Sequence, residues 1–260
     1  MPAFEALRSA ASRLRLDTWP GIDELNRALL AAGVRTGNGR PARLVTGGGA
    51  EWTGESYEVQ AFRTGAIGFR ERDWHDLFNA LVWLSFPCAK AALNARHATE
   101  LARETPGLRG RVRDALTLFD EDGLVVASSD PDLLTLIREF RWKELFWRKR
   151  ADVAARMRFL VFGHGLYQKA LAPFLGMTGR AALITVDESF FDLALAAQAA
   201  ALDARLAAIL SAPDLIRSPR DFCPVPVLGV PGWWHENRDR AFYDNTGYFR
   251  PGRTRDDGAK

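Results

Sequence analysis

Residues 73–97 carry side chains of catalytic and metal-binding types within an otherwise apolar segment. Two of the four histidines of the chain, His75 and His97, lie there together with Asp76. Polar groups of these types are unfavourable to bury unless they pair, bind a metal or take part in chemistry. This segment is therefore the first candidate for a functional site.

Imidazole and carboxylate groups are suitable ligands for a divalent metal ion. The sequence predicts that one such ion is bound by His75, Asp76 and His97. Alternatively, His75 is a general base. Lys90 would then stabilise developing negative charge, and two amides would orient the reacting groups. The predicted catalytic set is His75, Asn79, Lys90 and Asn94.

Two helices must position these groups. Asp73 is a suitable N-cap, with Asp76 three residues later as in a capping box. Pro87 suits the first turn of a second helix, which would extend to about residue 104. Residues three or four apart share a helix face, so each helix carries one polar stripe. We expect an antiparallel helical hairpin whose two stripes face each other.

The same residues also have a purely structural interpretation. Asp76 then only caps its helix, the asparagines bond backbone groups, and the histidines are satisfied core residues. His164, with a glycine on either side, is either a third imidazole of the pocket or a position of close helix packing. The acidic run 120–122 predicts a plain turn, because the twelve-residue calcium pattern is absent.

The predicted fold class is α+β, a helix-dominated single domain over residues 1–260 with a few short antiparallel strands. Apolar runs predict β-hairpins at 57–69 and 113–128 and a strand at 181–186. Helical patterns are found at 1–33, 131–150, 151–171 and 187–210. From residue 211 to 260, proline and aromatic residues predict an irregular tail that wraps the core.

Composition excludes the disordered and fibrous classes, with 47% hydrophobic and 26% charged residues. The two cysteines, Cys88 and Cys223, are too few for a disulfide framework and predict free thiols in a reducing compartment. The first residues are basic but lack the apolar stretch of a signal peptide, so we expect no secretory signal. No uninterrupted apolar stretch reaches about 18 residues. The sequence therefore predicts a cytoplasmic protein without a membrane partner, and it does not indicate an oligomeric state.

Cations and aromatic residues alternate along residues 138–150, and the net charge is +3. Such a segment could bind phosphates and stacked bases, or it is an amphipathic helix with its aromatic residues in the core. The first function we expect is a small metal-assisted hydrolase acting on a phosphodiester or another acidic substrate. The alternative is a non-catalytic protein that binds nucleic acid or a metabolite.

A family resemblance is carried by Trp74 to Trp83 (WHDLFNALVW), followed by Phe86-Pro87, Lys90 and Leu93-Asn94. It extends to residues 228–234, 242–244 and 248–251. These residues resemble the hallmark of an uncharacterised bacterial family, domain of unknown function 3025. The resemblance extends over most of the chain and implies no particular activity.

A weaker similarity is to the His-Me finger (HNH-type) nucleases. It would assign water activation to His75, and metal binding to Asp76, Asn79 and either Asn94 or His97. Those nucleases carry the first histidine on a β-hairpin, whereas residues 73–85 are predicted to be helical.

Overall fold

The computed structural model describes residues 2–15, 17–46, 56–104 and 108–252. Helices predominate, with two small sheets, and the buried apolar residues form one connected core. The chain is thus a helix-dominated α+β domain, as predicted. Among the described residues, we find no helix with both the length and the apolar character to cross a membrane.

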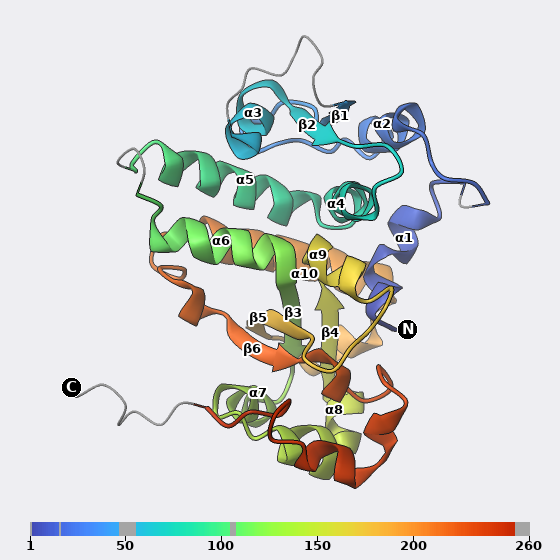
Figure 1. Ribbon diagram of the computed structural model, residues 1–260, viewed down its shortest axis with the longest axis vertical. Helices are drawn as coiled ribbons and strands as arrows, with labels where there is room; N and C mark the ends of the chain where they lie inside the picture. Colours follow the sequence, from blue (N-terminus) through green and yellow to red (C-terminus); the bar gives the residue numbers. More distant parts are fainter. Residues whose placement is uncertain (1, 16, 47–55, 105–107, 253–260) are drawn as a thin grey trace.

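A four-stranded sheet forms the centre of the core. Its order is β4 (Met157–Val161), β3 (Gly123–Ser128), β5 (Thr178–Thr185) and β6 (Cys223–Pro226). Strand β3 pairs in parallel with β5, and the other two pairings are antiparallel. Every residue of β3 is buried, as expected for a strand covered on both faces. Figure 1 shows α6 (Arg111–Asp122) at one end of β3 and α7 (Pro131–Arg138) at the other.

The second sheet joins β1 (Arg43–Thr46) and β2 (Ala66–Phe69) in parallel. It lies beside α2 (Ile22–Ala31) and α3 (Tyr57–Thr64), on the far side of α4 and α5 from the larger sheet (Figure 1). The predicted hairpin at 57–69 is therefore wrong. Helix α3 ends at Gly65, which adopts the left-handed conformation at φ 81°, and the glycine turns the chain into β2.

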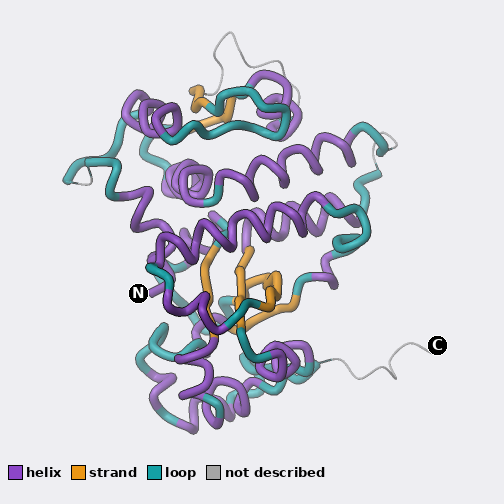
Figure 2. The backbone as a smooth tube through the Cα atoms, turned by 180° about the vertical axis from the view of Figure 1, so that it is seen from behind, coloured by secondary structure: helices purple, strands orange, loops and turns teal. Residues whose placement is uncertain are grey.

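Helices α4 (Trp74–Ser85) and α5 (Pro87–Leu101) begin as predicted. The Asp73 side chain accepts a hydrogen bond from the backbone N–H of Asp76, and Pro87 occupies the first turn of α5. The two helices do not form an antiparallel hairpin: α4 is seen nearly end-on where α5 lies across the view (Figures 1 and 2). Only Phe86 separates them, and one residue is too short a link to reverse a helix direction.

Two further predictions are corrected. Residues 111–122 are helix α6, which passes directly into β3 at Gly123, rather than the first strand of a hairpin. Residues 151–171 are not one helix: the backbone of 157–161 pairs with β3, and this strand separates α8 (Arg150–Arg156) from α9 (His164–Lys169). In both cases, long-range pairing with the central strand decides the local structure.

The remaining helical predictions are close to the structure. The alanine-rich segment forms α10 (Leu195–Ser211), preceded by a 3-10 turn at Glu188–Asp192. The N-terminal region forms a 3-10 helix at Pro2–Leu7 and α1 (Arg8–Ala11) before α2. A π-helical turn at Glu144–Arg148 lies between α7 and α8.

The segment after α10 is irregular, as predicted. Apart from β6, its described part consists of loops and short 3-10 turns, at Pro219–Asp221, Val227–Gly229, Glu236–Arg238 and Arg240–Asp244. The buried side chains of Tyr243 and Tyr248 bond backbone carbonyls at Gly229 and Met177, which anchors this segment to the core. Residues 253–260 of the predicted tail lie outside the described part.

Candidate functional site

Three helices bring two imidazoles and one carboxylate to a single point. His75 lies in the first turn of α4, Glu121 in the last turn of α6, and His164 is the first residue of α9. His75 Nε2 lies 3.3 Å from Glu121 Oε2, and His164 Nε2 lies 3.4 Å from Glu121 Oε1. The two imidazole rings are 4.3 Å apart, centroid to centroid, and nearly perpendicular. Both imidazoles therefore direct Nε2 at the same carboxylate.

The spacing of these atoms suits metal ligands. One ligand atom from each of the three residues can be chosen so that all lie within 4.8 Å of one another. Charge-assisted hydrogen bonds are normally about 2.7–2.9 Å long, shorter than the separations here. A tetrahedral zinc site with bonds of about 2.0–2.2 Å has ligand–ligand separations of about 3.3–3.6 Å. Two histidines and one glutamate are also a ligand set of catalytic zinc sites, which keep the fourth position open.

Each imidazole has a second carboxylate on its other nitrogen. His75 Nδ1 lies 3.2 Å from Asp76 Oδ1, whereas His164 Nδ1 lies 3.8 Å from Asp120 Oδ1, too far for a hydrogen bond, and is buried without a partner. A cation holds each of these carboxylates: Arg70 donates to both oxygens of Asp76, and Lys90 Nζ lies 2.6 Å from Asp120. Metal-binding histidines commonly have such an outer carboxylate partner, which orients the ring and raises its basicity.

The electrostatics of the cluster follow from these contacts. Hydrogen bonds to Asp76 and Glu121 raise the pKa of His75 to about 9. Hydrogen bonds from His164 and His75 hold the pKa of Glu121 well below its usual range. Burial raises the pKa of Asp120, but the charge and hydrogen bond of Lys90 together with the neighbouring His164 and His97 outweigh burial and leave this pKa lowered. The carboxylates are therefore ionised at neutral pH, as metal ligands and their partners must be, whereas His75 carries a proton that a bound metal ion would displace.

Because Gly165 has no side chain, the Glu121 carboxylate can lie directly against the backbone of α9. A Cβ atom at position 165 would lie 2.4 Å from Glu121 Oε2. Gly163 allows an equally close approach at the start of α9, where a Cβ would lie 2.3 Å from the backbone nitrogen of Gly123. The two glycines that flank His164 thus let α9 pack directly against the end of α6.

Gly165→Ala is expected to lower metal affinity without unfolding the protein. The added methyl group displaces the carboxylate of Glu121, while alanine is favourable within a helix by up to about 1 kcal/mol relative to glycine. Metal titration and thermal unfolding of the same samples separate the two effects. Gly21→Ala is the matched control, because a Cβ there meets no atom within 4 Å. Equal metal affinity in both variants would contradict this account.

Asp76→Asn is expected to weaken metal binding about 10- to 100-fold, the usual effect of removing an outer-shell partner. The amide keeps the shape of the carboxylate but removes the charge beside His75. Competitive titration with a chelator measures the change. Asp114→Asn serves as the control, since Asp114 is half exposed and pairs only with Arg109 among the described residues. A similar loss in both variants would argue against a specific role for Asp76.

A pocket of about 400 Å³ opens beside the cluster. Its lining includes His75, Glu121 and His164, together with polar residues that have free hydrogen-bonding atoms. Asn79 Nδ2 donates to the Tyr57 hydroxyl at 2.8 Å, whereas Asn79 Oδ1 is buried without a partner. His97 Nδ1 is also buried and unpartnered. Both atoms are covered by the surrounding protein, so they are unsatisfied hydrogen-bonding groups behind the surface of the pocket.

The structure places the sequence-predicted residues in different roles. His75, Asp76, Asn79 and His97 all line this pocket. Both oxygens of Asp76 are engaged by Arg70, although Asp73, His75 and Asp76 are also close enough to form a second possible ligand group. Burial lowers the pKa of His97 and favours its neutral form, and the described ligand groups do not include it.

Lys90 and Asn94 are outside the pocket lining. Lys90 acts on the site through Asp120, at 2.6 Å. Asn94 connects backbone segments: it accepts a hydrogen bond from Gly37 and donates one to the carbonyl of Glu58. Its side chain thus holds α5 to the loop before β1 and to α3.

Sequence reasoning missed Asp120 and Glu121 as site residues. The acidic run was predicted to be a turn, but it is the last turn of α6. A signal was present in the apolar positions 112, 115, 116 and 119, which follow the helical spacing and extend to the acidic run. A helix continuing through this spacing would have placed the two carboxylates on adjacent positions of its final turn.

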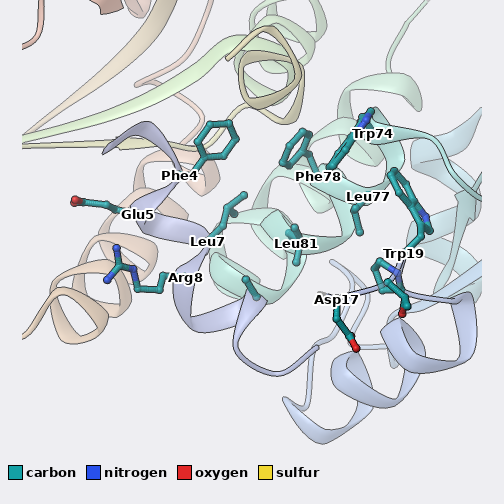
Figure 3. A pocket seen from close by; sticks show the side chains of 13 residues that line it. Phe4, Glu5, Leu7, Arg8, Asp17, Trp19, Trp74, Leu77, Phe78 and Leu81 are labelled. Atoms are coloured by element: carbon teal, nitrogen blue, oxygen red, sulfur yellow. The ribbon is translucent and has the colours of Figure 1, made fainter. Parts of the chain in front are cut away.

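A second hollow, of about 560 Å³, lies between α4 and the N-terminal helices (Figure 3). Phe4 and Leu7 face Phe78 and Leu81 across it, and Trp74 lies at its edge near Trp19. Its lining is mostly apolar and includes neither a histidine nor a cysteine among the described residues. The polar pocket is therefore the better candidate for chemistry.

A protein-family model, "Protein of unknown function (DUF3025)", matches residues 43–253 of the chain. The chain belongs to this family, as the sequence resemblance indicated. The matched region contains all three candidate ligands and both outer carboxylates. Neither the curated proteins nor the solved structures give a significant match.

The similarity to His-Me finger nucleases is not supported. His75 lies in the first turn of helix α4, and Asp76 and Asn79 lie on the same helix. A β-hairpin that carries the first histidine is absent from the described residues around position 75. The spacing of polar residues that suggested the similarity is explained by the helical repeat of α4.

Proposed function

We propose that the protein is a metal-dependent hydrolase whose metal ion is bound by His75, Glu121 and His164. The observation that carries the proposal is the convergence of both imidazole Nε2 atoms on the Glu121 carboxylate, with a further carboxylate beside each Nδ1. This arrangement supplies three ligands and two outer partners, and the 400 Å³ pocket provides access for a substrate.

A metal in such a site lowers the pKa of water and polarises a substrate carbonyl or phosphoryl oxygen. The residues of the chain would hold and tune it. Asp76 would fix the ring orientation of His75, and Asp120 would place a negative charge beside the ring of His164. Arg70 and Lys90 keep these carboxylates ionised. Asn79 and His97 lie in the pocket wall, where they would orient the substrate.

The alternative function, nucleic-acid binding through residues 138–150, has less support. Trp142 and Phe146 are buried in the core, so they do not offer surfaces for base stacking. Arg150 donates to Asn237, and Lys143 pairs with Asp244. Cations that already have intramolecular partners contribute little to a phosphate-binding patch.

Elemental analysis of the purified protein, followed by titration with zinc, tests the proposal. We expect about one divalent ion per chain and a metal-dependent increase in thermal stability, about 2.7 kcal/mol at a free metal concentration 100 times the Kd. Hydrolysis of neutral and anionic chromogenic esters and amides is then measured with and without the ion.

The hydrolysis measurement tests the reaction class. A divalent ion together with metal-dependent hydrolysis supports the proposal, whereas a bound ion without hydrolysis of any of these substrates argues against a hydrolase. A protein that binds no ion, and whose stability does not change on adding zinc, manganese or iron(II), would overturn it.

A further inference from the structure

We infer that the substrate of this pocket is a polypeptide, bound in extended form at the free edge of β2 beside the metal position. The inference deepens the proposed function by naming its substrate class. It rests on the backbone of Gly68, which is partly exposed and lines the pocket. Because glycine has no side chain, the surface that Gly68 offers to the pocket is peptide backbone.

The pairing of β1 with β2 determines which way the Gly68 backbone points. In a parallel pair of strands, a residue that directs its N–H and C=O at the partner strand lies opposite one whose groups point away. Leu44 of β1 lies opposite Ile67, and both backbone groups of Leu44 bond the Asn26 side chain instead of β2. Ile67 therefore directs its groups at β1. Successive strand residues alternate in direction, so the N–H and C=O of Gly68 point away from β1.

The same alternation directs this edge of β2 toward the candidate site. Arg70 follows the end of β2, two residues after Gly68, and its N–H donates to Asp76 Oδ2 at 2.7 Å. Asp76 in turn lies beside the proposed ligand His75, and both residues line the pocket. Two residues of a strand span only about 7 Å. A chain that pairs with Gly68 therefore passes close to the metal position.

The backbone of Gly68 is open to pairing. Within the described structure, β2 has one neighbouring strand, β1, and no described residue bonds the Gly68 N–H or C=O. The N–H groups on either side that share its direction are engaged, Ala66 with the Thr64 hydroxyl and Arg70 with Asp76. One residue of an added antiparallel strand exchanges both bonds with such a residue. Extended peptides bind to exposed sheet edges in this way.

This arrangement favours a peptide over the phosphodiester expected from the sequence. A phosphodiester offers acceptors without donors, so it could bond the N–H of Gly68 but not the C=O. A peptide unit carries one donor and one acceptor and satisfies both groups. The pocket volume of about 400 Å³ lies within the range of about 300–1,000 Å³ that is usual for small ligands. It therefore has room for a short stretch of extended chain.

Hydrolysis of a peptide bond in this position is balanced without a further reactant. The hydroxyl of water is added to the carbonyl carbon, the C–N bond breaks, and a proton from the water is transferred to the nitrogen. The products are a carboxylic acid and an amine.

The binding test uses acetyl-alanine methylamide and its two N-methylated isomers, titrated into the metal-free full-length protein and followed by NMR. The Gly68 amide proton should shift downfield as its hydrogen bond forms. Methylation of the alanine nitrogen removes the donor to the Gly68 C=O, so binding should weaken about three- to tenfold, the effect of one hydrogen bond. Methylation of the terminal amide, whose N–H points to the other side of an extended chain, should change binding less than about twofold.

Gly68→Pro removes the same contact from the protein side. Proline lacks the N–H that points away from β1, and it is tolerated at strand edges of this kind. Thermal unfolding should be nearly unchanged, while acetyl-alanine methylamide should bind at least about threefold more weakly. Gly21→Pro is the matched control and should change neither, because Gly21 is exposed and its φ of −76° suits proline.

The binding test is independent of the metal. No binding of the probe, binding without a shift of the Gly68 amide, or equal affinities of the two isomers would overturn the inference. These isomers are titrated into the unmodified protein, so their result decides the matter even if Gly68→Pro does not fold. Probe binding by a protein that takes up no metal would support the peptide site and overturn the proposed function. Metal-dependent ester hydrolysis without probe binding would do the opposite.

Discussion

Replacing Glu121 with glutamine is expected to reduce metal affinity at least 100-fold. The amide has the size of the carboxylate but lacks the charge, and its NH2 group cannot act as a ligand. The side chain of Glu121 is 41% exposed, so the fold should tolerate the change, with an effect on unfolding below about 1 kcal/mol. Chelator competition measures the affinity, and thermal unfolding checks the fold.

Asp122→Asn is the matched control for this variant. Asp122 is the next residue in the chain, but it pairs with Lys169 and does not line the pocket. It should bind metal like the unmodified protein. A loss of affinity in Asp122→Asn equal to that in Glu121→Gln would indicate a general effect of negative charge at the end of α6.

His97→Phe distinguishes the two possible ligand sets. The sequence predicts His75, Asp76 and His97, whereas the structure brings together His75, Glu121 and His164. If the second set binds the ion, His97→Phe retains stoichiometric metal and Glu121→Gln does not. The reverse result would favour the ligands predicted from sequence.

Replacing Lys90 with methionine is expected to destabilise the protein by about 3–5 kcal/mol, the usual effect of removing one partner of a buried ion pair. Lys90 is 2% exposed, and its ammonium is 2.6 Å from Asp120. Methionine fills similar space but leaves the Asp120 carboxylate uncompensated. Denaturant unfolding measures the free-energy change. Because Asp120 also lies 3.8 Å from His164, metal affinity should fall as well.

A surface ion pair at the same helix end gives the control. Lys169 is 43% exposed and pairs with Asp122 at 2.5 Å, so Lys169→Met should change stability by less than about 1 kcal/mol. The double variant Lys90→Met with Asp120→Asn should recover most of the lost stability, because it removes both charges. A Lys90→Met protein as stable as the control would contradict the importance of this pair.

The contacts of the buried charged residues explain why they are compatible with a stable core. Two buried charges have partners on another helix: Lys90 of α5 pairs with Asp120 of α6, and Asp203 of α10 accepts from the backbone N–H groups of Cys88 and Ala89. The second contact caps the start of α5 from a neighbouring helix. Ion pairs and hydrogen bonds between helices thus hold the helices together and also fix the positions of the site residues.

The local features of the first site helix were determined by the sequence alone. Asp73 and Asp76 predicted where α4 begins, and Pro87 predicted the start of α5, because capping and proline preferences depend only on neighbouring residues. The same spacing placed His75, Asp76 and Asn79 close together, since residues three or four apart share a helix face. The α+β class and the irregular final segment also followed from composition and pattern.

Only the tertiary structure decided which residues meet His75. The distances in sequence from His75 to Glu121 and to His164 are large, and helical spacing says nothing about contacts of that range. The position of Glu121 depends on α6 ending where β3 begins, and that of His164 depends on β4 pairing with β3 instead of continuing a helix. Strand pairing and the close approach permitted by Gly163 and Gly165 are long-range effects, so the complete ligand set became visible only in the folded chain.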